Sequence, residues 1–218
     1  MILLQLCKVF LLSQLRNRQI LLATVFFSVF LIFLFTLAFP KIDQSQQGYF
    51  SGIFWISSFF SGNLILTHQT QMQSGKFQQG LLLTGIDSSQ LFFAKLISSL
   101  IYMLFIQVVL FASMNMFFTL PENISLSRIA LYCILGSIGF LSIGTLFFSL
   151  IEFQNVTDLF ITILFYPLVI PLFLYLHKAT TMIFSGKSSN VLDFVIGYDL
   201  IFVFLSALLY EFIIEDNV

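Results

Sequence analysis

Charged residues are scarce in this chain of 218 residues, where Asp, Glu, Lys and Arg together make up only 9% of the sequence. A soluble domain carries about 25% charged residues, so this chain lacks the side chains needed to cover a water-exposed surface. Hydrophobic residues make up 59%, and the mean hydropathy is +1.02. This composition excludes a soluble globular domain and indicates an integral membrane protein. The formal net charge of -1 indicates no nucleic-acid partner.

Cysteine is limited to Cys7 and Cys133, which have the spacing of neither a metal motif nor a redox motif. No nucleophile–base pair and no pair of carboxylates with a catalytic spacing stands out in the sequence. We therefore predict no catalytic residue and no metal site, and we do not expect the chain to be an enzyme.

Long apolar runs predict an all-α fold, a polytopic membrane helical bundle of about six transmembrane helices. A helix needs about 20 apolar residues to cross the hydrocarbon core. Residues 1–18 carry Lys8, Arg16 and Arg18 among leucines, which predicts an interfacial helix before the first crossing. The whole chain, 1–218, is predicted to form a single transmembrane domain. Its expected spans are residues 20–39, 49–66, 96–118, 129–150, 159–176 and 194–214.

Positive charge predicts the orientation of this bundle. Lys8, Arg16 and Arg18 precede the first span and only Lys41 follows it, so the N-terminus is expected in the cytoplasm. Six crossings then place the C-terminus and residues 68–90 on the same side.

Residues 68–90 form the longest polar interval of the chain. Its glutamines cannot remain in lipid, because they would lose water without gaining partners. Apolar residues recur among the glutamines with a helical step of four, which predicts a short amphipathic helix at the membrane face. We therefore predict a cytoplasmic coupling segment between the second and third spans. The expected docking residues are Met72, Gly75, Phe77, Gln78 and Leu81.

Small and polar residues within the spans predict how the helices pack. Ser57 and Ser61 in the second span, and glycines in the fourth, allow close helix approach. Pro167 and Pro171 should kink or break the fifth span, and a loop is expected from residue 177 to 192. Gln107 should hydrogen-bond a neighbouring helix. Asp199 and Glu211 lie near opposite ends of the sixth span and are expected to reach the interface.

The only histidines, His68 and His177, should lie at opposite membrane faces. The roughly 18 helical residues between these levels span about 27 Å, so the two side chains cannot bind one haem together. We expect each to be an interface residue that reaches water, and we predict no directly bound cofactor.

The sequence Ser185-Gly186-Lys187-Ser188 matches only the end of a phosphate-binding P-loop. The full motif requires a glycine at the position that Thr181 occupies, and it requires a strand where this chain has an apolar span. If ATP drives this protein, a separate partner must bind it.

Three segments resemble the permeases of the cytochrome c maturation system, called haem exporter protein B (CcmB). Gly52-Ile53-Phe54-Trp55-Ile56 is similar to the family's opening of the second span. Phe93-Ala94-Lys95 is similar to the end of its cytoplasmic segment, which also contains a glycine, here Gly75. Tyr166-Pro167-Leu168-Val169-Ile170-Pro171-Leu172 is similar to its paired-proline fifth span, and this pattern is the most specific of the three.

The resemblance implies a membrane-spanning permease subunit of an ABC transporter complex for c-type cytochrome biogenesis, in a bacterial or organellar inner membrane. A cytoplasmic ATPase partner would hydrolyse ATP, with haem as the cargo. The energy would serve either haem export or the release of a haem-loaded chaperone from a membrane haem-handling protein. Relatives usually carry acids where this chain has glutamines such as Gln78, so docking here is expected to depend on apolar burial. The alternatives are a secondary transporter and a non-transporting assembly scaffold.

Overall fold

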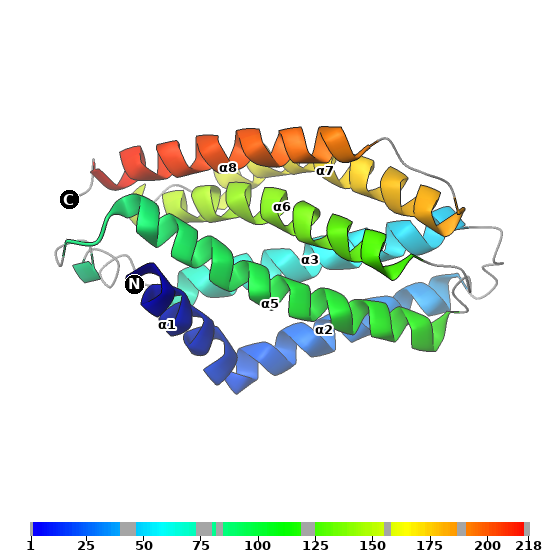
Figure 1. Ribbon diagram of the computed structural model, residues 1–218. Helices are drawn as coiled ribbons and strands as arrows, with labels where there is room; N and C mark the ends of the chain where they lie inside the picture. The colour runs from blue at the N-terminus through cyan, green and yellow to red at the C-terminus, as the bar shows by residue number, and fades with distance from the viewer. Residues whose placement is uncertain are drawn as a thin grey trace.

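The computed structural model describes residues 2–39, 47–72, 80–81, 85–118, 125–154, 158–186 and 191–215. The long elements of this part are all helices, and six of them are long and apolar enough to cross a membrane. This confirms the predicted polytopic helical bundle (Figure 1). The helices are α1 (Ile2–Arg16), α2 (Arg18–Ala38), α3 (Gln47–Met72), α5 (Ser88–Phe117), α6 (Leu126–Gln154), α7 (Asp158–Phe184) and α8 (Leu192–Glu215).

The helices of the bundle run alongside one another, and both chain ends lie at the same end of the molecule (Figure 1). Helix α6 packs against α3, α5, α7 and α8 and thus occupies the centre. Helix α2 lies at the edge, where it packs on α3 and α5 and buries only Thr24, Ser28 and Ile32. Helices α2 and α8 expose many large apolar side chains, as expected of helices that face lipid.

Small residues let the central helices approach closely, as the sequence predicts. A Cβ added to Gly62 of α3 would collide with the Phe140 ring of α6, and one added to Gly144 would collide with Leu66. The serines on this face of α3 are fully buried. Ser61 and Ser28 share a hydrogen bond of 2.8 Å between their hydroxyls, which joins α3 to α2 inside the bundle.

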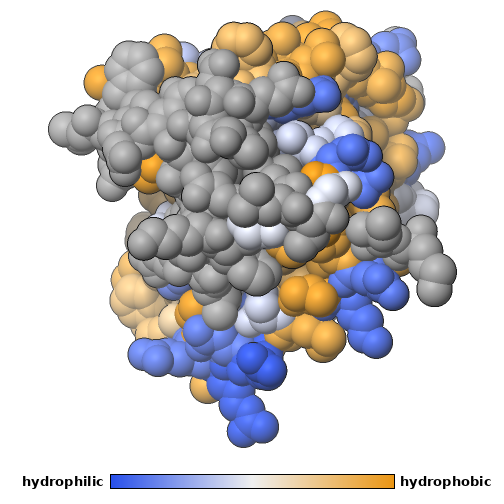
Figure 2. All heavy atoms as spheres, turned by 90° about the vertical axis from the view of Figure 1, so that its left-hand side faces the viewer, coloured by the Kyte–Doolittle hydropathy of each residue, from blue (hydrophilic) through white to orange (hydrophobic). Residues whose placement is uncertain are grey.

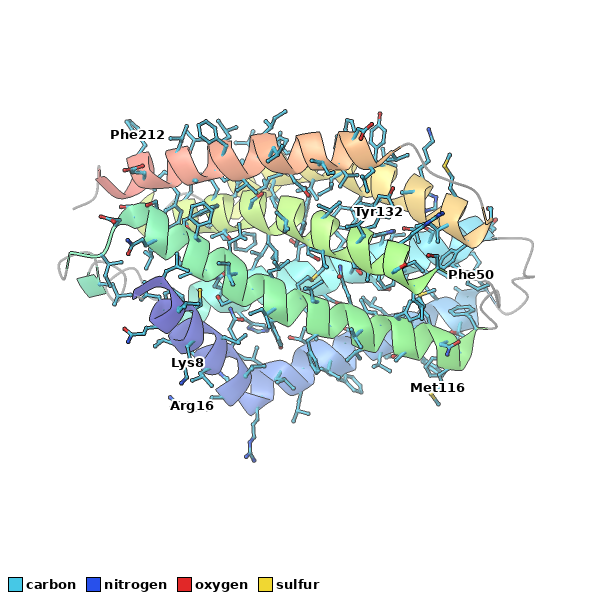
Figure 3. The ribbon with its side chains drawn as sticks, viewed as in Figure 1. Lys8, Arg16, Phe50, Met116, Tyr132 and Phe212 are labelled. Atoms are coloured by element: carbon cyan, nitrogen blue, oxygen red, sulfur yellow. The ribbon has the colours of Figure 1, made fainter. Side chains whose placement is uncertain are left out.

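Helix α1 packs along the first turns of α5 and meets α2 at an angle (Figure 1). Its buried face consists of Leu6, Cys7 and Phe10, which join a cluster with Leu91 and Phe92. Lys8 and Arg16 are exposed on α1 and point away from the bundle in Figure 3. In Figure 2, which faces the end that carries both termini, hydrophilic residues gather at the bottom, at the level where α1 meets α2 in Figure 1.

Helix α7 continues through both prolines without a break and ends at Phe184. The Tyr198 hydroxyl of α8 donates a 2.7 Å hydrogen bond to the Leu168 carbonyl between the prolines, which ties α8 to α7 at this level. The predicted loop from residue 177 to 192 is therefore wrong over its first eight residues. The turn after the helix contains Gly186, whose φ of 69° is a conformation that favours glycine.

Candidate functional site: a groove between α3 and α7

Two of the segments that carry the family resemblance, residues 52–56 and 166–172, meet in one groove. Gly52 and Trp55 come from the N-terminal half of α3, and the wall opposite them comes from α7 beyond Pro167. The groove has a volume of about 450 Å³. It is lined by Gly52, Trp55, Ile56, Phe59, Phe60, Val169, Ile170, Phe173, Leu174 and His177.

Hydrogen bonds fix the walls of this groove to each other. The Trp55 indole donates from Nε1 to Thr180 Oγ1 over 2.9 Å, and Thr180 donates in turn to the Leu176 carbonyl over 2.8 Å. Close by, the Ser51 hydroxyl donates to the His177 carbonyl over 2.9 Å. Polar contacts of this kind are costly to leave unmade in lipid, so they hold α3 and α7 at a defined separation.

Aromatic rings cover the inner surface of the groove. The Phe173 ring lies edge-on to Trp55, at 5.8 Å between centroids, and to Phe59, at 5.3 Å. Phe140 of α6 packs behind both phenylalanines, with centroids 5.8 and 5.7 Å away. Perpendicular rings at these distances are a favoured packing, and they leave flat apolar faces along the groove.

His177 lies at the boundary between this groove and a second hollow of about 570 Å³. The two hollows share Gly52, Ile56 and His177, and the second is also lined by Tyr49, Thr181 and Ser185 among others. His177 is half-buried. Its Nδ1 is fully enclosed and has no hydrogen-bond partner within the described residues. The prediction that His177 is an interface residue stays a prediction, because its ring is partly exposed while one of its nitrogens is enclosed.

Helix α7 passes close to Gly52 of α3. A Cβ built at this position would lie 3.8 Å from His177 Cε1, an ordinary van der Waals contact. His68 lies 16 residues further along α3, about 24 Å away at 1.5 Å per residue. The two histidines thus belong to different ends of the bundle, and one iron cannot contact both.

Two of the predicted docking residues, Met72 and Leu81, are described, and they lie at the end of the molecule opposite the groove. Met72 is the last residue of α3, and Leu81 packs against the cluster formed by α1, α5 and α8. Gly75, Phe77 and Gln78 fall outside the described residues, so the docking surface stays a prediction.

Lys95 follows the predicted coupling segment. It is 2% exposed, and its Nζ lies 5.6 Å from the Tyr210 ring centroid. Helix α5 therefore begins before the predicted third span, and side chains of its first turns are also buried inside the bundle.

Asp199 is a buried acid, and its predicted place at the interface is wrong. It is 5% exposed, and neither carboxylate oxygen has a hydrogen-bond partner among the described residues. Its Oδ1 contacts the space where a Cβ of Gly139 would lie. The glycine and serine steps of the fourth span were the available signal, because a small-residue face admits a side chain from a neighbouring helix. Glu211, by contrast, is exposed on α8.

Gln107 also differs from its prediction. It is 3% exposed, and its amide has no hydrogen-bond partner within the part of the chain that the structure describes. In that same part, no group of three or more His, Cys, Asp or Glu side chains is arranged to hold a metal ion. The α3–α7 groove combines a volume, walls joined by hydrogen bonds and aromatic side chains, and we take it as the candidate site.

Comparison with known proteins adds one positive finding. A family model described as CcmB protein matches residues 1–212 of the 218 residues. A search of curated proteins found no match.

Proposed function

Because the chain belongs to the CcmB protein family, which serves haem transport and cytochrome c biogenesis, we propose that it is the membrane-spanning permease subunit of an ABC transporter complex. The observation that carries the proposal is the family match over residues 1–212 together with six membrane-crossing helices. In this complex a separate cytoplasmic subunit hydrolyses ATP. The N-terminus and the segment after α3 face that subunit, in an inner membrane.

The course of α3 supports a mechanical link between the two ends of the molecule. One uninterrupted helix of 26 residues begins beside the groove and ends at Met72, within the predicted coupling segment of residues 68–90. The groove residues Gly52 and Trp55 and the docking end thus belong to one rigid element. Displacement of the docking segment by the ATPase would move the α3 wall of the groove relative to α7.

This movement would transfer haem toward cytochrome c assembly. The groove favours direct handling of haem, because it supplies a flat aromatic surface of suitable size beside the membrane. Release of a haem-loaded chaperone from a neighbouring membrane haem-handling protein is the second outcome of the same coupling, and it would need no groove on this chain.

Co-purification and energy dependence test the proposal. The tagged chain should retain an ATPase subunit in mild detergent, and membranes that contain the complex should assemble holocytochrome c only with hydrolysable ATP. A proton uncoupler should leave assembly intact when ATP is supplied. Assembly that follows the proton gradient and ignores ATP would indicate a secondary transporter, and absence of any ATPase from the complex would contradict the permease assignment.

A further inference from the structure

We propose that the outward side of α1, together with its corner to α2, binds the headgroups of anionic phospholipids, and that this contact holds α1 against the bundle. The surface is separate from the α3–α7 groove, and its partner does not depend on the cargo of the complex. Three features point to this partner: the pattern of side chains along α1, the level at which α2 enters the membrane, and the absence of acids from this part of the sequence.

One side of α1 alternates apolar and basic side chains. Leu4, Lys8, Leu12 and Arg16 follow one another at steps of four, so they lie along the same side of the helix. All four are exposed, Leu4 by 74% and Leu12 by 52%. The opposite side of α1 is buried in the cluster that α1 forms with α5 and α8. The exposed side thus offers leucines and cations in turn to whatever surrounds the bundle.

The corner between α1 and α2 lies at the level of the lipid headgroups. Arg16 ends α1, Asn17 caps α2 by accepting a 3.4 Å hydrogen bond from the Ile20 N–H, and Arg18 is the first residue of α2. The 21 residues of α2 form an apolar helix long enough to cross the membrane, so the hydrocarbon begins within about a turn of the corner. Arg18 is exposed, and Arg16 points away from the bundle in Figure 3. Both guanidinium groups can therefore reach lipid phosphates.

Charge complementarity identifies these lipids as anionic. The first acidic residue of the chain is Asp43, so the sequence before it carries cations and no carboxylate side chain. Among the described residues, none forms an ion pair with Lys8, Arg16 or Arg18. Cations beside a bilayer are attracted to anionic headgroups, and leucines between them insert at the boundary with the acyl chains. The outward side of α1 supplies both contacts.

The buried side of α1 explains why a lipid contact would matter for its position. Leu6, Cys7 and Phe10 pack well, but Gln14 on the same side is 4% exposed, and neither atom of its amide group has a hydrogen-bond partner within the described residues. A buried unpaired amide opposes packing, so a contact on the outer side adds to a partly opposed one. Leu81 of the predicted coupling segment packs on the same cluster as α1. Release of α1 would therefore also loosen the docking end of the molecule.

Photocrosslinking tests the lipid contact directly. The full-length chain carries p-benzoylphenylalanine at position 12 and is placed in nanodiscs that contain equal amounts of phosphatidylglycerol and phosphatidylcholine. After irradiation, mass spectrometry should find about fivefold more phosphatidylglycerol than phosphatidylcholine on α1, the preference expected from one cation near the headgroup. The same amino acid at position 131 is the control, because Leu131 is also exposed but lies near the start of α6, at the other end of the bundle. It should capture the two lipids equally.

Lys8→Gln combined with Arg16→Gln should remove the preference at position 12, and so should high salt, which screens the cations. Arg128→Gln combined with Lys178→Gln is the matched control, since these exposed cations belong to α6 and α7. That pair should leave the preference at position 12 unchanged. Arg16→Lys keeps the charge and should behave as the wild type.

The thiol of Cys7 reports whether lipid holds α1 in place. In a Cys133→Ala chain, an uncharged maleimide should label Cys7 about fivefold more slowly in nanodiscs with phosphatidylglycerol than in phosphatidylcholine alone. Ser185→Cys in a chain without the natural cysteines corrects for the effect of the charged surface on any exposed thiol. Soluble glycerol phosphate added to the phosphatidylcholine nanodiscs should not protect Cys7.

Three results would overturn the proposal: equal capture of the two lipids at position 12, a preference that survives the double variant of Lys8 and Arg16, and labelling of Cys7 that is independent of lipid charge. Protection of Cys7 by soluble glycerol phosphate would also contradict it, because the partner would then be a free anion. ATP-dependent assembly of holocytochrome c tests the proposed function separately and does not decide between these outcomes.

Discussion

The indole of Trp55 and the hydroxyl of Thr180 form a buried 2.9 Å hydrogen bond that joins α3 to α7. Thr180 is 1% exposed and Trp55 3%, so neither group has access to water as a replacement partner. The bond therefore sets the separation of the two helices that make the groove.

Thr180→Val keeps the shape of the side chain and leaves the Trp55 N–H without an acceptor. We expect the free energy of unfolding to fall by about 1–3 kcal/mol, the cost of an unsatisfied buried donor. Thermal unfolding in detergent, followed by circular dichroism, measures this change. Thr36→Val is the control, because the Thr36 hydroxyl bonds only to the Ile32 carbonyl of its own helix. Equal losses in the two variants would contradict an inter-helix role for Thr180.

Gly139→Ala should destabilise the bundle by about 1–3 kcal/mol, the usual cost of overpacking a filled core. The new methyl group would collide with Asp199 and with Leu172, whose Cδ2 would lie 3.0 Å away. Gly197→Ala is the matched control, since a Cβ on Gly197 meets nothing within 4 Å. That variant should be neutral or slightly stabilising, because alanine is the better helix former. Unfolding of both variants is compared under the same conditions.

Phe77→Ala should weaken binding of the ATPase partner about tenfold to a hundredfold, because burial of one Phe contributes about 1.5–3 kcal/mol. Pull-down of the partner across ionic strength measures this effect. Lys76→Ala is the control for charge at the same segment and should change binding little. Binding that survives Phe77→Ala but is lost at high salt would show an electrostatic contact instead.

Burial raises the pKa of the Cys7 thiol on α1. Because the thiolate is the reactive form, the reaction of Cys7 with a water-soluble maleimide should require a higher pH than that of an exposed thiol, whose pKa is about 8.5. Lys8→Cys, in a chain where both natural cysteines are alanine, places an exposed thiol one residue away and should react at lower pH. Equal pH profiles for the two thiols would show that α1 does not pack on α5 as described.

Pro167→Ala combined with Pro171→Ala restores two backbone donors within α7. We expect this double variant to insert normally but to impair cytochrome c assembly, because the prolines set the course of the groove wall. The readout is the level of holocytochrome c relative to the amount of variant in the membrane. Assembly at the wild-type level would show that the prolines are dispensable.

The six spans were predictable because apolar runs of about 20 residues have few alternatives to crossing lipid. The end of α7 was not predictable, because threonines such as Thr180 and Thr181 are common in loops. In the structure their hydroxyls donate hydrogen bonds to carbonyls one turn back within the helix. Those threonines extend the helix past His177 and bring it into the groove.

The placement of Asp199 was unpredictable for a similar reason. The position of Asp199 near one end of α8 suggested an interface residue. Its burial depends on Gly139, which lies 60 positions earlier on another helix. The groove likewise joins two segments more than a hundred residues apart. The sequence indicated each of these segments, and only the packing of α3 against α7 shows that they form one surface.

The hydrogen bond between Ser28 and Ser61 has a consequence for biosynthesis. Helix α3 contains four serines, against one in α2, and it leaves the ribosome when α2 is the only span already made. Most of its neighbours, from α5 to α7, are synthesised later. Ser28 thus offers the incoming helix its first polar contact within the bilayer. The two spans can enter the membrane as a pair, so α3 has a polar partner in lipid before the second half of the chain is synthesised.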